Sequence, residues 1–127
     1  DTFSQVPSEF KKIGCTSFEE ASQNLMLRTA VYELSTLNLF VPMGPNTLAY
    51  LNKNVDYVIF KFFIDGVMYS PGVEEATEEA RWNQFKIMPG NGWVFAKNTQ
   101  IISKYKDESE YIIKEFNRAM SLMSLDE

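Results

Sequence analysis

The chain has 127 residues, of which 45% are hydrophobic and 23% are charged, a balance typical of one folded domain rather than of a disordered segment. Its 12 basic and 17 acidic residues give a formal net charge of −5, which disfavours binding to nucleic acid or anionic membranes because both need positive charge. The sequence has no histidine and a single cysteine, which excludes Ser-His-Asp and Cys-His catalysis, internal disulfides and classical zinc sites.

The first strong element predicted is a long helix over residues 17–38. Thr16 is a suitable N-cap, and Glu19 stands three residues later, which is the spacing of a capping box. Apolar residues cover a wide face of this segment, so we expect the helix to be buried on more than one side. The helix should end before Pro42, and a second short helix is expected over residues 46–52.

Residues 55–64 are the clearest predicted strand, because β-branched and aromatic side chains dominate them. Asp65 and Gly66 follow, and this pair is a strong signal for a two-residue hairpin turn. Residues 67–70 are the expected return strand. These signals favour an antiparallel sheet.

A second antiparallel pair is predicted from residues 84–88 and 93–97, which flank a Pro-Gly-Asn-Gly turn at 89–92. Residues 100–105 are a candidate for one more strand. A final helix follows, capped by Asp107, and one apolar stripe defines its expected core face. That stripe comprises Ile112, Ile113, Phe116, Ala119, Met120 and Met123.

The predicted fold class is α+β: an antiparallel sheet of about four strands packed against a long N-terminal helix and a C-terminal helix. The predicted organisation is one domain over residues 1–127, with 1–15 as an N-terminal extension and 124–127 as a frayed tail. No apolar run is long enough to cross a membrane, so we expect no membrane insertion. The chain starts at Asp1, which suggests processing or truncation and leaves the compartment open, secreted and organellar locations included.

The strand at 55–64 has an unusual second face. Side chains alternate along a strand, so Tyr57, Ile59, Lys61 and Phe63 share this face, and only Lys61 is polar. A two-layer fold normally leaves one sheet face polar. We therefore expect another helix of this chain, a bound apolar ligand or a partner protein to cover it.

The candidate binding residues are the aromatic and apolar side chains on this face and on the second hairpin. Trp and Tyr are enriched in interface hot spots, but aromatic stripes are also common in cores, so the alternatives of core packing, protein partner and small apolar ligand stay open. The candidates are Tyr57, Ile59, Phe63, Trp82, Trp93 and Phe95.

Four carboxylates form a second candidate cluster. On a helix, Glu74 with Glu78 and Glu75 with Glu79 would each face one way. Such a cluster can bind a hard cation or perform acid-base chemistry, but it is more often a solvated helix face. We assign no catalytic residue, metal ligand or cofactor.

The sequence favours a non-enzymatic interaction or structural subunit that docks on a larger assembly, or on a second copy of itself, through an aromatic sheet face. The alternative is a small domain that binds a hydrophobic ligand between sheet and helix. A second alternative is a histidine-free enzyme that uses carboxylates.

Overall fold

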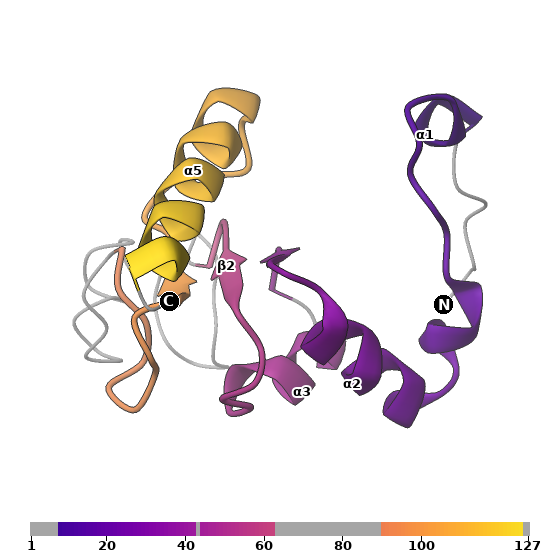
Figure 1. Cartoon of the computed structure of the whole chain (residues 1–127), viewed down its shortest axis with the longest axis horizontal. Coiled ribbons are helices and arrows are strands. Elements are labelled where there is room, and N and C mark those ends of the chain that lie inside the picture. Colours follow the sequence, from indigo (N-terminus) through magenta and orange to yellow (C-terminus); the bar gives the residue numbers. More distant parts are fainter. Residues whose placement is uncertain (1–7, 43, 63–89, 126–127) are drawn as a thin grey trace, which may run out of the picture. The chain divides into compact units, whose positions relative to one another are not determined.

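The computed structural model describes residues 8–42, 44–62 and 90–125 of the chain (Figure 1). Contacts between Cα atoms divide the chain into two compact units, Asp1–Val31 and Tyr32–Glu127. The predicted strands at 67–70 and 84–88, the hairpin turn at Asp65-Gly66 and the four-glutamate cluster lie outside the described residues.

The first unit begins with helix α1 (Ser8–Lys12), which ends at Gly14. Gly14 has a φ of +86°, and the N–H of Cys15 donates to the carbonyl oxygen of Phe10 at 2.9 Å. This left-handed glycine with a hydrogen bond back to the last turn is a common helix end. This short helix lies in the segment that the sequence analysis assigned to an N-terminal extension.

The predicted long helix over 17–38 is wrong. The structure has a 3-10 helix, η1 (Glu19–Ser22), followed by a separate helix, α2 (Leu25–Leu34). No side-chain cap forms at the start of η1, so the predicted capping box is absent. Instead the side-chain oxygen of Asn24 accepts the N–H groups of Met26 and Leu27, at 3.0 and 3.1 Å. Asn24 therefore starts α2, because its side chain satisfies two otherwise unpaired helix N–H groups.

The sheet of the second unit has three parallel strands in sequence order, β1 (Asn38–Phe40), β2 (Tyr57–Ile59) and β3 (Gln100–Ile102). Tyr57 aligns with Asn38 on one side and with Gln100 on the other. The predicted antiparallel sheet of four strands is therefore contradicted. The fold is mixed α/β, and the predicted strand at 100–105 is confirmed only as the shorter β3.

Both faces of β2 are buried by the chain's own side chains. Strands of a parallel sheet are covered on both faces and read as continuous apolar runs, which agrees with the scarcity of polar residues in this segment, although the sequence analysis predicted antiparallel pairing here. On one face Ala49, Val55, Tyr57, Ile59 and Ile102 form a buried cluster, with Tyr32, Phe40, Tyr50, Phe62 and Trp93 packed around it. On the other face Val58, Phe60, Ile101 and Ala119 are buried, with Leu37, Ile112 and Leu122 packed against them.

The connection from β1 to β2 contains the 3-10 helix η2 (Gly44–Asn46) and helix α3 (Thr47–Tyr50). These confirm the predicted short helix in a shorter form. The Asn46 side chain donates to the carbonyl oxygen of Val41 at 2.5 Å and ties the start of this connection to the end of β1.

Helix α5 (Ser109–Leu125) confirms the predicted C-terminal helix and lies beside β2 (Figure 1). Its buried face differs from the predicted stripe. Ala119 and Glu115 are buried, whereas Ile113 and Phe116 are 61% and 40% exposed. Apolar residues occupy more of the surface of α5 than the sheet can bury, so their pattern in the sequence does not show which of them are buried.

The predicted strand at 93–97 is also wrong. Residues 90–92 instead run past the outer edge of β3, where the N–H of Gly90 donates to Ile102 O at 2.9 Å and the N–H of Ile102 donates to Asn91 O at 3.0 Å. A Cβ atom at Gly92 would lie 2.0 Å from Gln100 O, so only glycine fits there. Residues 93–97 then leave the sheet as a loop.

Gln100 is a buried polar residue whose hydrogen bonds join β3 to two loops. Its Nε2 donates to the carbonyl oxygens of Asn52 and Val55, at 2.8 and 2.9 Å, and its Oε1 accepts the N–H of Lys97 at 3.3 Å. The side chain is therefore fully used, as buried polar groups usually are.

Replacing Gln100 with Leu should lower the free energy of unfolding by about 3 kcal/mol, because one buried and two partly buried backbone groups lose their partner. The measurement is urea unfolding. Asn98→Leu, an exposed change in the same loop, is the control and should stay within about 0.5 kcal/mol of the parent. Equal losses for the two variants would contradict the role given to Gln100.

Candidate functional site

Two of the predicted binding residues lie inside the core. Tyr57 and Ile59 are fully buried, and the Tyr57 hydroxyl donates to the carbonyl oxygen of Tyr50 at 3.1 Å. The Tyr57 ring centroid is 5.9 Å from that of Tyr50 and 6.1 Å from that of Phe40. These contacts cover the sheet face from within the chain. Phe63 and Trp82 lie outside the described residues.

The other two predicted residues come together in one loop. The rings of Trp93 and Phe95 are nearly parallel, with an interplanar angle of 6° and centroids 6.1 Å apart. Trp93 is half-buried, and its ring meets Phe62 edge-on at 5.5 Å. Phe95 is 54% exposed and Val94, between them, is 87% exposed. We call residues 93–95 the aromatic loop.

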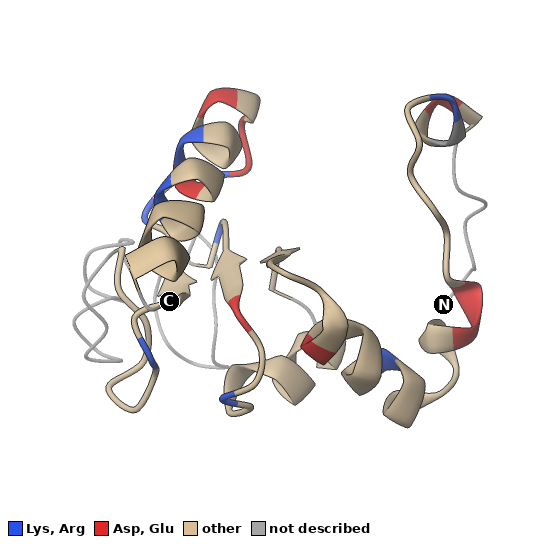
Figure 2. Ribbon diagram, viewed as in Figure 1, with Lys and Arg blue, Asp and Glu red and all other residues tan. Residues whose placement is uncertain are grey.

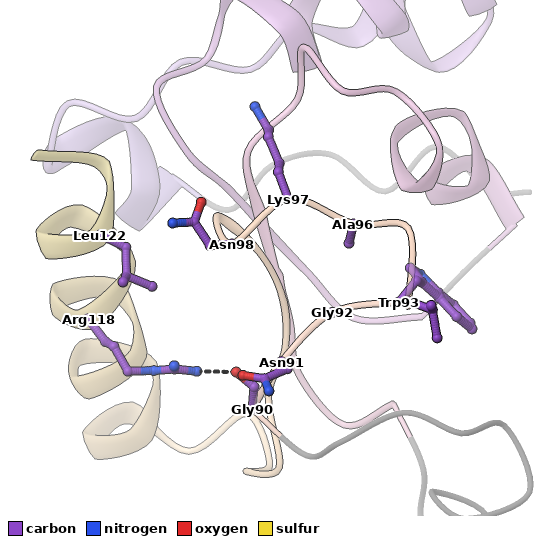
Figure 3. Close-up of a pocket in the computed structure, with 10 residues that line it drawn as sticks. Gly90, Asn91, Gly92, Trp93, Ala96, Lys97, Asn98, Arg118 and Leu122 are labelled. Carbon is purple, nitrogen blue, oxygen red and sulfur yellow. Dashed lines mark hydrogen bonds between the residues drawn. The ribbon is translucent and has the colours of Figure 1, made fainter. Parts of the chain in front are cut away.

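A hollow of about 560 Å³ lies beside the aromatic loop, between residues 90–98 and helix α5 (Figure 3). We call it the loop hollow. Its size falls within the range of ligand pockets. Its wall combines apolar and polar side chains, including Trp93, Val94, Asn91, Asn98, Arg118 and Leu122.

Lys97 also lines the loop hollow, but its charge is already paired. Its Nζ lies 2.8 Å from Asp56 Oδ1, which also accepts the Thr99 hydroxyl at 2.6 Å. This pair ties the end of the loop to the start of β2.

Arg118 lines the loop hollow and makes two interactions. Its Nη2 donates to the carbonyl oxygen of Gly90 at 2.7 Å (Figure 3). Its Nε pairs with Glu115 Oε2 at 2.9 Å. The Glu115 side chain is only 4% exposed, whereas that of Arg118 is 40% exposed. A buried carboxylate needs a compensating charge, and Arg118 supplies it. This pair was not predicted from the sequence, although Glu115 and Arg118 stand three residues apart on the predicted helix, a spacing that brings side chains together.

The pKa of Tyr57 is raised well above its usual value of 10. Burial is the main cause, the neighbouring Tyr50 adds to it, and the Trp93 N–H acts in the opposite direction. That buried N–H has no partner with good hydrogen-bond geometry among the described residues. The pKa of Tyr50 is also raised, again mainly by burial. These shifts belong to a packed core and not to a general base.

No protein family, curated protein or solved structure matched this chain. Function must therefore be inferred from the geometry of the chain itself. In residues 8–42, 44–62 and 90–125, no helix combines the length and hydrophobicity that a membrane crossing needs. In the same ranges, no three His, Cys, Asp or Glu side chains gather closely enough to hold a metal ion.

Tyr57 should make the fold sensitive to alkaline pH. The unfolded chain releases the tyrosine proton near pH 10, whereas folded Tyr57 keeps it, so stability should fall as pH rises above 10 by about 1.4 kcal/mol per pH unit for each such group. Urea unfolding at several pH values should show that the free energy of unfolding falls less steeply with pH in Tyr57→Phe than in the parent. Tyr105→Phe is the control, because the pKa of Tyr105 is lowered by its hydrogen bond to Lys114 and its removal should not lessen the fall.

Arg118→Met should lower the free energy of unfolding by about 2 kcal/mol, because the buried Glu115 carboxylate loses its partner while one end of the pair stays near water. Lys114→Met, one helical turn earlier and exposed, is the control and should change it by less than about 0.5 kcal/mol. The double change Glu115→Leu with Arg118→Met should recover most of the loss. A double variant as unstable as Arg118→Met alone would contradict this account.

Proposed function

We propose that this chain is a non-enzymatic interaction domain that docks on a partner protein through the aromatic loop. The observation that carries the proposal is the exposure of Val94 and Phe95, at 87% and 54%, on a loop that Trp93 anchors in the core. Adjacent exposed apolar side chains next to a hollow are typical of protein interaction sites.

The anchoring of the aromatic loop favours binding. Gly92 lies against β3 at the start of the loop, the N–H of Ala96 donates to Trp93 O at 2.9 Å, and Gln100 accepts the N–H of Lys97. The loop therefore does not have to become ordered when a partner binds. A loop that already has its bound conformation loses less conformational entropy when it associates with a partner.

The loop hollow suits one inserted side chain of the partner. Trp93, Val94 and Leu122 contribute apolar side chains to its wall, and Asn91 and Asn98 contribute polar ones. A specific interface usually combines apolar and polar contacts. In this proposal the buried Tyr57 and Ile59 support the loop from the core rather than touch the partner.

A small-molecule ligand is the second candidate, because the loop hollow is large enough for one. The sequence predicted an apolar ligand enclosed between the sheet and a helix, with Tyr57 in its wall. Tyr57 is instead packed among side chains of the core. A ligand in the loop hollow would also meet Arg118 and two asparagines, which suits a polar molecule better than an apolar one.

Val94→Asp should remove partner binding without unfolding the domain, because the side chain is almost fully exposed and a charge there would have to be desolvated in the interface. The measurement is affinity capture from the native source with the parent and the variant as baits. Light scattering after size exclusion, over a range of concentrations, tests whether the partner is a second copy.

Leu51→Asp is the matched control, since Leu51 is 70% exposed at the end of α3 and does not line the loop hollow. A protein retained by the parent and by Leu51→Asp, but lost from Val94→Asp, would support the proposal. Retention of the same proteins by all three baits, together with a monomer at every concentration, would overturn it.

A further inference from the structure

A second, smaller hollow is also lined by Arg118, and we infer that it binds a phosphate group. Its volume is about 250 Å³, and we call it the basic hollow. It lies between the segment that follows β3 and the first half of α5. Its lining residues are Gly90, Asn91, Lys104, Tyr105, Lys114, Glu115 and Arg118, and the Glu115 carboxylate is paired with Arg118.

The cationic groups of the basic hollow come from two elements and converge on one tyrosine. The Nζ atoms of Lys104 and Lys114 lie 5.2 and 5.0 Å from the centroid of the Tyr105 ring. Lys114 Nζ also donates to the Tyr105 hydroxyl at 3.1 Å. Arg118 is one turn further along α5, and residues at this spacing lie on the same side of a helix. Figure 2 shows basic residues on neighbouring turns along one side of α5, with acidic residues at its start and one acidic segment beside the basic ones.

The charges of the basic hollow do not cancel. Arg118 is balanced by Glu115, but neither Lys104 nor Lys114 has a carboxylate within 4.0 Å in the described ranges of the chain. Two positive charges therefore remain, in a chain whose net charge is −5. The local field already favours negative charge, since the hydrogen bond from Lys114 and the charge of Lys104 lower the pKa of Tyr105. A phosphate dianion supplies the two missing negative charges and accepts several hydrogen bonds at once.

The segment that carries Lys104 is held in place before any ligand binds. Tyr105 stacks on Tyr111 at 4.4 Å with an interplanar angle of 3°, which fixes the ring against α5. The N–H of Lys61 donates to Tyr105 O at 3.2 Å, from a residue with a left-handed φ of 57°. Lys61 Nζ also lies 3.4 Å from Asp107. Such preorganisation lowers the cost of binding a small anion.

The position of the basic hollow in the fold also fits a ligand. Lys104 and Tyr105 come two and three residues after the last residue of β3, so they lie at the carboxyl end of a parallel strand. Open parallel sheets bind their ligands at this edge. The inference goes beyond the proposed function, because neither Val94 nor Phe95 lines the basic hollow.

The phosphate can be free or part of a larger molecule. The two hollows share Gly90, Asn91 and Arg118, so they are neighbours. Inorganic phosphate and phenyl phosphate distinguish these sources. Tighter binding of phenyl phosphate would identify a phosphate monoester, and equal affinities would identify free phosphate.

The test is a titration of the full chain with each compound, followed by two-dimensional amide NMR, with sodium chloride at equal ionic strength as the reference. We expect the amides of Gly90, Asn91, Lys104 and Tyr105 to shift. Lys114→Gln and Lys104→Gln should each weaken binding about tenfold, because each removes one charge-assisted hydrogen bond. Lys106→Gln is the matched control from the same segment and should bind as the parent does.

Val94→Asp should also bind phosphate as the parent does, so failure of the docking proposal and failure of this one are distinguishable. Lys104 and Lys114 are exposed, so neither single variant should disturb folding. Shifts no larger than those caused by sodium chloride would overturn the inference. Unchanged affinity in both lysine variants would do the same, since the phosphate would then bind elsewhere.

Discussion

The burial of β2 on both of its faces is the constraint on which the second unit depends. Val58 faces one buried cluster, and Tyr57 and Ile59 face the other. Each fully buried Val or Ile contributes about 1.5–3 kcal/mol relative to an exposed side chain. A strand as short as β2 can gain this stability only if other elements bury both of its faces. Helix α5 does so on one face, and α3 with the half-buried rings does so on the other.

That burial forces the polar groups around the strands to find partners inside the protein, and the partners position the loops. Asn38 donates from Nδ2 to the carbonyl oxygens of Tyr32 and Asp56, each at 3.0 Å, and thereby joins the end of α2 to the start of β2. Gln100 does the same for the aromatic loop. The surfaces proposed for binding are thus held by hydrogen bonds that the core requires, which is why exposed side chains such as Val94 stand on a fixed backbone.

The sequence predicted the parts of this fold that local signals determine. Helix α5, the helical turn before β2 and the centre of β2 follow from apolar periodicity, turn signals and β-branched patterns. The direction of the sheet did not follow, because Asn38 pairs with Tyr57 across a connection that no local pattern reveals. The hairpin signals favoured antiparallel pairing, and the polar Asn38 resembled the end of a long helix. Aromatic density likewise identified Tyr57 and Trp93 as unusual, but density is the same in a core and in an interface, and only burial separates Tyr57 from Phe95.

Arg118 connects the two proposed binding surfaces physically. Its guanidinium reaches Gly90 O, at the wall that both hollows share, while its charge is matched by the buried Glu115. Because Glu115 neutralises Arg118, the attraction for an anion comes from Lys104 and Lys114. The role of Arg118 is to hold Gly90, which lines both hollows. An anion close to Arg118 would compete with Glu115 for the N–H groups of the guanidinium. A shift of the guanidinium would in turn change its hydrogen bond to Gly90, which lies just before the aromatic loop. Glu115 therefore neutralises the charge of Arg118, while the hydrogen bond from Arg118 to Gly90 still links the two hollows structurally.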